Sequence, residues 1–266
     1  MKRQAVNLFI KHTKYDVSQI KSIAQIHNGF TNISYKVTTT DGCMYQIRIG
    51  NNHVVERNNE NTILKTIKDK TYLYFNTKTG DAIKKWIIGV NPTYKQVCSS
   101  MFLKAFAKSL ITLHNINTKT HKILKHDYLD CFKRSKLPSR HRDKYLSLIK
   151  QYQNIPMVLS HNDLSADNLI YTPNHQVIFI DYEWSRLNNA YWDVANFIRE
   201  VGLPLNKIKE LYSYLKLEDI KTLLNFVYLS TNYAYQWTFN MPMNPKIKKY
   251  RSIVLKKMEH YFNWVN

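Results

Sequence analysis

The sequence has few cysteines and no long apolar segment. Cys43, Cys98 and Cys131 lie far apart and form no C-x-x-C pair, which argues against a disulfide framework or a zinc site and favours a reducing compartment. No stretch approaches the roughly 18 uncharged apolar residues of a membrane span. The apolar run near the N-terminus ends at Lys11, too early for a signal peptide. We therefore expect a cytoplasmic protein.

Acidic residues are half as numerous as basic ones. The 266 residues include 39 Lys and Arg but 19 Asp and Glu, which gives a formal net charge of +20. Such a field attracts nucleic acid, an anionic membrane or a nucleoside triphosphate without choosing among them. Because the basic residues are scattered along the chain, a general lysine bias is favoured over a nucleic-acid groove. A hydrophobic fraction of 44% is enough for a folded core of one large domain or two lobes.

Apolar spacing divides the chain into a strand-rich beginning and a mainly helical remainder. In the first part we expect one helix over 53–68 and strands at 33–39, 44–49, 71–75 and 83–88. Later helices are predicted over 97–113, 144–152, 192–201, 219–237 and 248–264, interrupted by short β-runs at 157–160, 169–171 and 176–180. We therefore predict an α+β, bilobal fold. Its N-terminal lobe (1–88) is a small antiparallel sheet with one helix, its C-terminal lobe (89–266) is larger and mainly helical, and a ligand cleft lies between them.

A polar segment among the short β-runs carries the strongest chemical signal. In HNDLSADN, Asp163 and Asn168 lie five residues apart, and Asp181 ends the run VIFID that folds back after a turn. Because paired strands lie about 4.8 Å apart, we expect positions 168 and 181 to be neighbours. An amide and an acid suit Mg²⁺, which prefers oxygen ligands and substrate phosphates. A second acid can accept a proton from an attacking hydroxyl, so these are the parts of a phosphoryl-transfer site.

The same residues resemble a known motif. Residues 161–164 followed by Asn168 look like the H-x-D-x-x-x-x-N motif of the protein-kinase-like fold, in its small-molecule branch of aminoglycoside and choline kinases. Asp181 is similar to the second metal-binding acid of that superfamily. The resemblance implies that ATP is the phosphate donor and that Asp163 orients and deprotonates the acceptor hydroxyl. It further implies that Asn168 and Asp181 hold Mg²⁺.

The residues after Asp181 resemble the choline/ethanolamine kinase form, D-[FYW]-E-[YW] followed by F/W-D-x-A-N-x-x-x-E. Here they are Tyr182-Glu183-Trp184 and then 192–200. The resemblance implies that Glu183, with the rings of Tyr182 and Trp184, receives a cationic acceptor, because aromatic faces attract quaternary ammonium groups. We expect Asp193 to brace the catalytic loop. Glu200 fits either the motif or a solvated surface charge.

The N-terminal part carries weaker motifs of the same family. Asn28-Gly29-Phe30-Thr31-Asn32 resembles its G-G-x-[ST]-N loop over the nucleotide phosphates, but Asn28 replaces a glycine. Arg48 looks like the basic residue of the third strand, which grips phosphate oxygens, and Glu60 is its natural ion-pair partner, with Arg57 in an R-x-x-E pattern. By the resemblance, 83–89 is the hinge, where the backbone of Trp86 and Ile87 meets the adenine. His114 is interpreted as structural.

The C-terminal aromatic residues leave the acceptor open. Tyr233, Tyr235 and Trp237 lie on a predicted helix, where choline kinases usually carry W-x-x-W. Only Trp237 falls in place, so Tyr233 and Trp237 are candidates for the choline pocket, while helical spacing also fits a core.

The resemblance implies an ATP- and Mg²⁺-dependent kinase that phosphorylates the hydroxyl of choline to phosphocholine for lipid or surface-glycan use. Ethanolamine, thiamine or an aminoglycoside are alternative acceptors, the last disfavoured by the scarcity of acids. A nucleic-acid-binding protein with a degenerate kinase fold is the alternative from another class. A protein kinase is disfavoured because D-F-G and A-P-E are absent. We expect no nucleic-acid partner, and a homodimer stays open.

Overall fold

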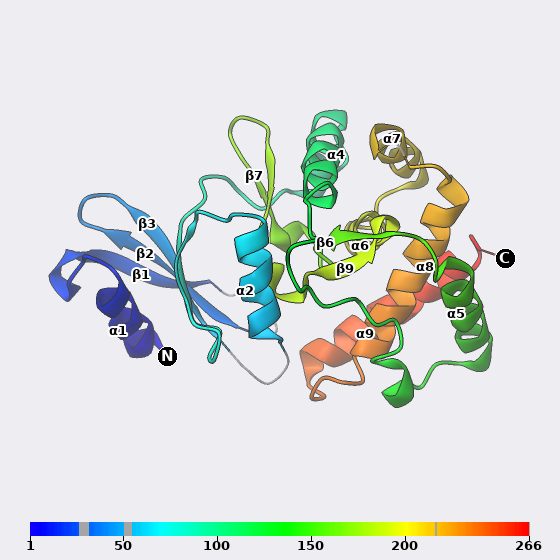
Figure 1. Ribbon diagram of the computed structural model, residues 1–266, viewed down its shortest axis with the longest axis horizontal. Helices are drawn as coiled ribbons and strands as arrows, with labels where there is room; N and C mark the ends of the chain where they lie inside the picture. Colours follow the sequence, from blue (N-terminus) through cyan, green and yellow to red (C-terminus); the bar gives the residue numbers. More distant parts are fainter. Residues whose placement is uncertain (27–31, 51–54, 216, 266) are drawn as a thin grey trace. The chain divides into compact units, whose positions relative to one another are not determined.

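The computed structural model describes residues 1–26, 32–50, 55–215 and 217–265 (Figure 1). The chain forms two compact units. The first consists of Met1–Val90, Lys119–Ile123 and Asp181–Trp184, and the second of the segments Asn91–Thr118, Leu124–Ile180 and Ser185–Asn266. Residues 181–184 thus belong to the first unit although about ninety residues separate them from its main part.

The first unit is built on a five-stranded antiparallel sheet with the order β1-β2-β3-β5-β4. Its strands are β1 (Ile20–Ile26), β2 (Ile33–Thr39), β3 (Met44–Ile49), β4 (Tyr72–Phe75) and β5 (Ala82–Lys85). The strands predicted at 33–39 and 44–49 are confirmed at both ends. The strand predicted over 83–88 is wrong in its second half, because β5 ends at Lys85.

One face of this sheet carries an apolar core with helix α1 (Lys2–His12). Ala5 and Phe9 of α1 are fully buried there, and the ring of Phe9 lies 5.2 Å from that of Tyr45. Ile47 and Ile49 of β3 belong to the same core. Because successive strand residues point to opposite faces, Arg48 lies on the other face. Helix α1 is not among the predicted elements, so the first unit has one helix more than expected. A short 3₁₀ turn, η1 (Val17–Gln19), follows it.

Helix α2 (Arg57–Thr66) is the helix that the sequence predicts in this unit. It is shorter than the predicted 53–68, and residues 51–54 lie outside the described part. Ile63 and Leu64 bury its apolar side, while the fully buried Glu60 comes from the same helix. After α2 the chain turns at Lys68, which has a positive φ of 54°, and enters β4.

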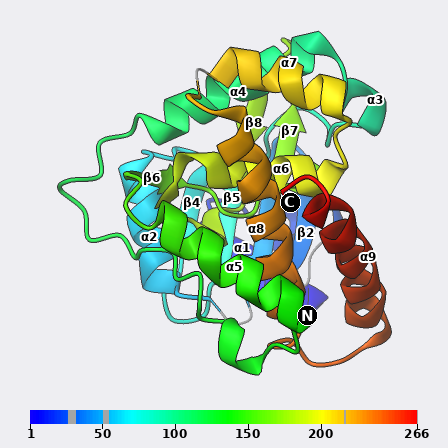
Figure 2. The same ribbon diagram turned by 90° about the vertical axis from the view of Figure 1, so that its right-hand side faces the viewer.

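The second unit is mainly helical, as predicted. Its helices are α3 (Tyr94–Val97), α4 (Ser100–His114), α5 (Ser139–Tyr152), α6 (Ala190–Val201), α7 (Leu205–Leu215), α8 (Ile220–Trp237) and α9 (Pro245–Phe262), with 3₁₀ turns η2 (Phe132–Arg134) and η3 (Ala166–Asn168). Helix α7 lies outside the predicted helices, and α5 begins five residues earlier than expected. Helix α8 packs against α5, α6 and α9 (Figure 2). Stacked rings of Phe106 and Phe197, 4.1 Å apart, join α4 to α6.

Four short strands position the loops of this unit. The hairpin of β7 (Leu169–Tyr171) and β8 (Val177–Phe179) is confirmed, with Leu169 opposite Phe179. Strand β6 (Met157–Ser160) pairs with β9 (Arg186–Asn189). The polar sequence of β9 lacks the apolar alternation of a strand, which is why no strand is predicted there. Among the described residues, no helix is long and apolar enough to cross a membrane.

Candidate active site

Asp163 and Asn168 lie together in the loop between β6 and β7. The Asn168 side-chain amide donates to the backbone carbonyl of Asp163 (2.7 Å) and to its carboxylate Oδ2 (2.9 Å). The 3₁₀ turn η3 brings them together, because it places Asn168 at its end, directly before β7. The backbone N–H of Ile180 donates to the Asn168 carbonyl at 3.0 Å. The end of the returning strand is predicted to lie beside position 168, and this hydrogen bond confirms it for Ile180.

His161 fixes the beginning of this loop. Its Nε2 lies 2.9 Å from the carbonyl of Ile180, and its Nδ1 accepts from the backbone N–H of Asp163 at 3.4 Å. A carbonyl can only accept, so His161 carries its proton on Nε2. Burial lowers the pKa of His161, although Asp193 acts in the opposite direction. A neutral imidazole with a hydrogen bond at each ring nitrogen thus connects Asp163 to the end of the strand that precedes Asp181.

Asp193 braces the loop from α6, as expected from the sequence. Its two carboxylate oxygens accept the backbone N–H groups of His161 (2.9 Å) and Asn162 (2.8 Å). His114 of α4 lies 3.0 Å from the same carboxylate, which confirms its structural interpretation. Burial favours the neutral acid, but the hydrogen bond and charge of His114 and the neighbouring His161 outweigh it and lower the pKa of Asp193.

Two asparagines that the motif does not identify also hold the loop. Asn162 has a positive φ of 64°, a conformation that asparagine tolerates better than most residues, and its Oδ1 accepts from Asn188 of β9 at 2.7 Å. Asn91 donates to three backbone carbonyls, those of Ala166, Asp167 and Leu169, at 2.9–3.3 Å. Neither contact has a sequence signal, since both join segments far apart in the chain.

In the first unit, Arg48 and Glu60 form the predicted ion pair. Arg48 Nη1 lies 2.7 Å from Glu60 Oε1, and both side chains are at most 5% exposed. Arg57, of the R-x-x-E pattern, contacts the other oxygen of Glu60 at 2.7 Å. Glu60 therefore holds two guanidinium groups, one from β3 and one from its own helix. A buried pair of this kind fixes orientation, because leaving either partner alone is costly.

Glu183 lies in the same cluster. The 3₁₀ turn η4 (Tyr182–Trp184) places it in the first unit, where its Oε2 accepts from Arg57 (3.0 Å) and from the Asn32 amide (2.7 Å). The Glu183 side chain is 4% exposed. Its charge is thus paired with Arg57, and its expected role toward a cationic acceptor stays a prediction. Asn32, expected over nucleotide phosphates, also accepts a hydrogen bond from Arg57 at 2.9 Å.

Asp181 stands at the start of this segment in a left-handed conformation with φ 66°. Its Oδ1 lies 3.4 Å from Arg48 Nη1. Burial and then the nearby Glu183 carboxylate raise the pKa of Asp181 to about 7, while Arg48 and Lys84 act in the opposite direction. Such a carboxylate favours a cation, because a positive charge beside it would offset the cost of ionisation.

The donor atoms fit Mg²⁺. With its amide nitrogen occupied by Asp163, Asn168 presents an Oδ1 that has no partner among the described residues, and Asp181 Oδ2 has none in that part of the chain either. Hard oxygen donors in small number are what Mg²⁺ takes from protein when phosphates supply the rest. No group of three or more His, Cys, Asp or Glu in the described ranges could hold a metal ion, so what the structure shows is one suitable oxygen donor on each of these two residues, each within its own unit.

The face of the sheet that bears Arg48 also carries lysines. Lys84 of β5 lies opposite Gln46, and Lys36 of β2 opposite the same residue, so strand alternation puts all three cations on one face. Lys36 Nζ lies 4.5 Å from the ring centre of Trp86. The N–H of Trp86 donates to the carbonyl of Met44, so that donor is not available to an adenine. Ile87 follows β5 and is partly buried; Asn28, Gly29, Phe30 and Thr31 lie outside the described residues.

The candidate acceptor-binding rings divide into separate groups. Tyr233 lies in a cluster with Trp192 (5.6 Å between ring centres) and His126 (4.7 Å), and its hydroxyl donates to Asp130 at 3.0 Å. Trp237, one helical turn later, instead contacts Tyr250. Tyr182 and Trp184 belong to the first unit with Glu183. The candidate rings therefore belong to two units, and their expected role toward the acceptor stays a prediction.

The ring cluster of the second unit is connected to the catalytic loop. The rings of Tyr128 and Trp192 meet edge to face, with their centres 5.3 Å apart. The Tyr128 hydroxyl donates to Asn188 Oδ1 at 2.5 Å. Asn188 in turn donates to Asn162, which directly precedes Asp163. His126, Tyr128 and Asp130 lie in a connecting segment without regular structure, so periodicity gives no signal for them.

Comparisons with known proteins bear on the family and the fold. A model of the choline/ethanolamine kinase family matches residues 23–265. An uncharacterized protein of Mycoplasma pneumoniae is 34% identical over 268 residues, covering 98% of this chain and 93% of the relative. The structure of choline kinase LicA from Streptococcus pneumoniae has a TM-score of 0.75 at 18% identity and covers 98% of both chains. That of Plasmodium vivax ethanolamine kinase has a TM-score of 0.74 at 22% identity, covering 94% of this chain and 85% of that chain.

A structure of LicA in complex with AMP is also similar, with a TM-score of 0.71 at 18% identity over 91% of this chain and 92% of that chain. At these identities the solved structures establish the fold. They confirm the α+β, protein-kinase-like fold expected from the sequence.

Proposed function

Because this chain belongs to the choline/ethanolamine kinase family, we propose that it transfers the γ-phosphate of ATP to the hydroxyl of choline. The products would be ADP and phosphocholine. The observation that carries the proposal is the Asp163–Asn168 contact, held in place by Asp193 and His161. A carboxylate fixed beside an amide is what this chemistry needs, since catalysis of phosphoryl transfer is largely positioning and charge stabilisation.

Asp163 is the proposed base. Asn168 holds one of its oxygens, which would orient the carboxylate toward an acceptor hydroxyl. As the hydroxyl oxygen bonds to phosphorus and the bond to ADP breaks, Asp163 takes the hydroxyl proton. Asn168 and Asp181 are the proposed Mg²⁺ ligands, and the ion would neutralise charge on the phosphate oxygens.

Arg48 is the proposed phosphate-binding residue. Glu60 occupies its Nη1, whereas its buried Nη2 has no hydrogen-bond partner among the described residues. A buried guanidinium nitrogen without a partner is costly, and a phosphate oxygen would satisfy it with a strong charge-assisted bond. Lys84, on the same face of the sheet, adds a second positive charge.

The rings around Tyr233 are the proposed site for the cationic end of the acceptor. Quaternary ammonium groups bind aromatic faces, and the Tyr128, Trp192 and Tyr233 cluster reaches the catalytic loop through Asn188. Asp130, which accepts a hydrogen bond from the Tyr233 hydroxyl, supplies a carboxylate in this cluster. Ethanolamine is the main alternative acceptor, because its amine would use Asp130 rather than the rings.

The test is ADP release from Mg-ATP with choline, ethanolamine, thiamine and kanamycin offered in parallel. We expect choline-dependent turnover that is lost in Asp163→Ala while ATP binding, measured by calorimetry, survives. Asp167→Ala is the matched control, because Asp167 is an exposed carboxylate in the same loop. Near-normal turnover of Asp163→Ala would contradict the assigned base.

The acceptor and the reaction are tested separately by the same assay. Turnover with ethanolamine, thiamine or kanamycin alone would replace choline and leave the kinase assignment in place. Absence of ATP binding, together with salt-sensitive affinity for DNA or RNA, would instead favour a nucleic-acid-binding protein with a degenerate kinase fold.

A further inference from the structure

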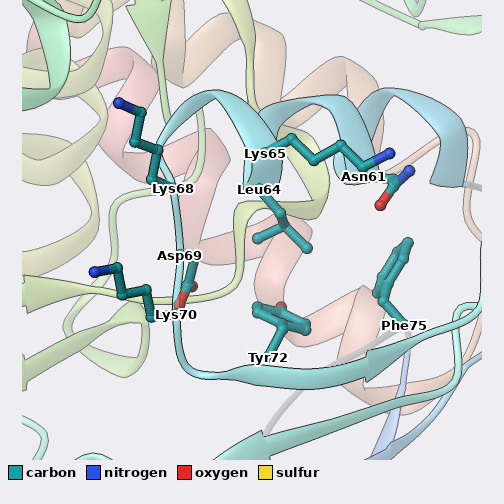
Figure 3. Close-up of a pocket in the computed structure, with 8 residues that line it drawn as sticks. All are labelled: Asn61, Leu64, Lys65, Lys68, Asp69, Lys70, Tyr72 and Phe75. Atoms are coloured by element: carbon teal, nitrogen blue, oxygen red, sulfur yellow. The ribbon is translucent and has the colours of Figure 1, made fainter.

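The first unit has an apolar hollow between α2 and β4 (Figure 3). Its volume is about 330 Å³. Leu64 from α2 and the rings of Tyr72 and Phe75 from β4 form its middle (Figure 3). An apolar concavity of this size is large enough to receive a bulky side chain.

Lysines stand on two sides of this apolar middle. Figure 3 shows Lys65 directed along α2 toward Asn61 on one side and Lys68 and Lys70 on the other. None of the three ammonium groups forms an ion pair within the described ranges of the chain. Asp69 is the one acid among the eight lining residues, and its carboxylate is held by the N–H and hydroxyl of Thr71.

The spacing of these charges indicates the shape of what binds. A compact anion such as phosphate needs cations that converge on one point, whereas these lysines bracket the apolar middle from opposite sides. The arrangement complements an extended segment with a central apolar side chain and carboxylates before and after it. A second copy of the chain is a poor partner, because each copy carries a formal net charge of +20 and the two would repel.

We propose that this hollow binds an acidic segment of a partner protein. The segment inserts an aromatic side chain against Leu64, Tyr72 and Phe75, and its carboxylates pair with Lys65, Lys68 and Lys70. The site shares no residue with the proposed catalytic machinery, so binding can be measured without nucleotide or acceptor.

The probe is a fluorescein-labelled peptide Glu-Glu-Phe-Glu-Glu, titrated with the full chain and followed by anisotropy at low salt. We expect it to bind about tenfold more tightly than Glu-Glu-Ala-Glu-Glu, as burying one aromatic anchor allows. The same peptide core flanked by lysines should not bind. Equal affinity for the Phe and Ala peptides would overturn the proposal, because the hollow would then contribute nothing.

Two pairs of variants locate the site. The triple variant Lys65→Glu, Lys68→Glu, Lys70→Glu should weaken binding of the Phe peptide by tenfold or more. Its control, with Lys2, Lys11 and Lys21 changed to Glu, alters net charge equally on α1 and β1, and β1 is at the other edge of the sheet from β4. Equal weakening by both triples would mean attraction to net charge alone and would overturn the proposal.

The second pair changes shape without changing charge. Asn61→Trp places a ring at the hollow, whereas Asn58→Trp places one on an exposed position of the same helix. We expect only Asn61→Trp to abolish the preference for the Phe peptide over the Ala peptide. Thermal melts of all four variants establish that the loss of binding is not loss of folding, and a preference retained in Asn61→Trp would contradict the assigned location.

Discussion

The carboxylate of Glu183 lies 3.0 Å from the guanidinium of Arg57, 126 residues earlier in the chain. Both side chains are nearly inaccessible to solvent, and Arg57 also contacts Glu60 of its own helix. The segment 181–184 is thereby fixed to α2 by a charge pair. Since the Arg48–Glu60 pair belongs to the same cluster, the orientation of Arg48 depends on a residue of the D-x-E-x motif.

Glu183→Gln is expected to destabilise the protein rather than weaken binding of the acceptor. In this variant Arg57 keeps the charge of Glu60 and loses that of Glu183. Losing one partner of a buried ion pair costs about 3 kcal/mol. Urea unfolding measures this loss, with exposed Glu218→Gln as control. The KM for choline should stay within about twofold. A large rise in KM with unchanged stability would show that Glu183 does bind the cation.

Gly80→Ala is expected to be much more harmful than Gly42→Ala. Both glycines have positive φ, 75° and 83°, so both substitutions strain the backbone by about 1 kcal/mol. A Cβ on Gly80 would lie 2.3 Å from Arg57 Nε, whereas nothing lies within 4 Å of one on Gly42. The difference between the two variants in unfolding free energy therefore measures the cost of displacing the Arg57 side chain. Equal losses in the two variants would contradict the tight packing at Arg57.

Asp193→Asn is expected to lower kcat without affecting nucleotide affinity. Asparagine can accept only through one oxygen, so one of the backbone N–H groups of His161 and Asn162 loses its partner. A small displacement of a catalytic group can cost about 100-fold in rate, while ATP affinity should change less than about twofold. Glu200→Gln, on the same helix but bonded to Tyr250, is the control. A kcat within twofold of the unmodified protein would show that the brace is dispensable.

The buried His126 predicts a loss of stability in acid. Burial, and then the charge of Arg186, lowers the pKa of His126 to about 3, compared with about 6.5 in an unfolded chain. The stability it contributes is complete above pH 6.5 and is lost as the pH falls toward 3, at about 1.4 kcal/mol per pH unit.

Substitution tests this directly. Urea unfolding at pH 6 and pH 4.5 should show a smaller drop for His126→Phe than for the unmodified protein, because that variant has no imidazole to protonate. His121→Phe, at an exposed position, should show the same drop as the unmodified protein. Identical pH dependence for all three would mean that His126 is accessible to protons in the folded state.

Much of the site is predictable because its signals are local. Asp163 and Asn168 share one loop, and Arg48 and Glu60 follow from the order of a strand and the next helix. The contact between Glu183 and Arg57 is not predictable, because a motif specifies a residue type and not what it faces. Helix α1 lies outside the predicted helices because its buried face needs only Ala5 and Phe9, too few for a clear period.

The first unit takes residues 181–184 from a part of the chain that is made late. During synthesis, residues 1–90 leave the ribosome well before Glu183, and at ordinary translation rates the interval is on the order of ten seconds. Throughout it, Arg57 lacks its Glu183 counter-charge. A truncated product that stops at residue 90 would never gain it, so the nascent sheet and α2 reach their final set of ion pairs only after more than half of the second unit has emerged.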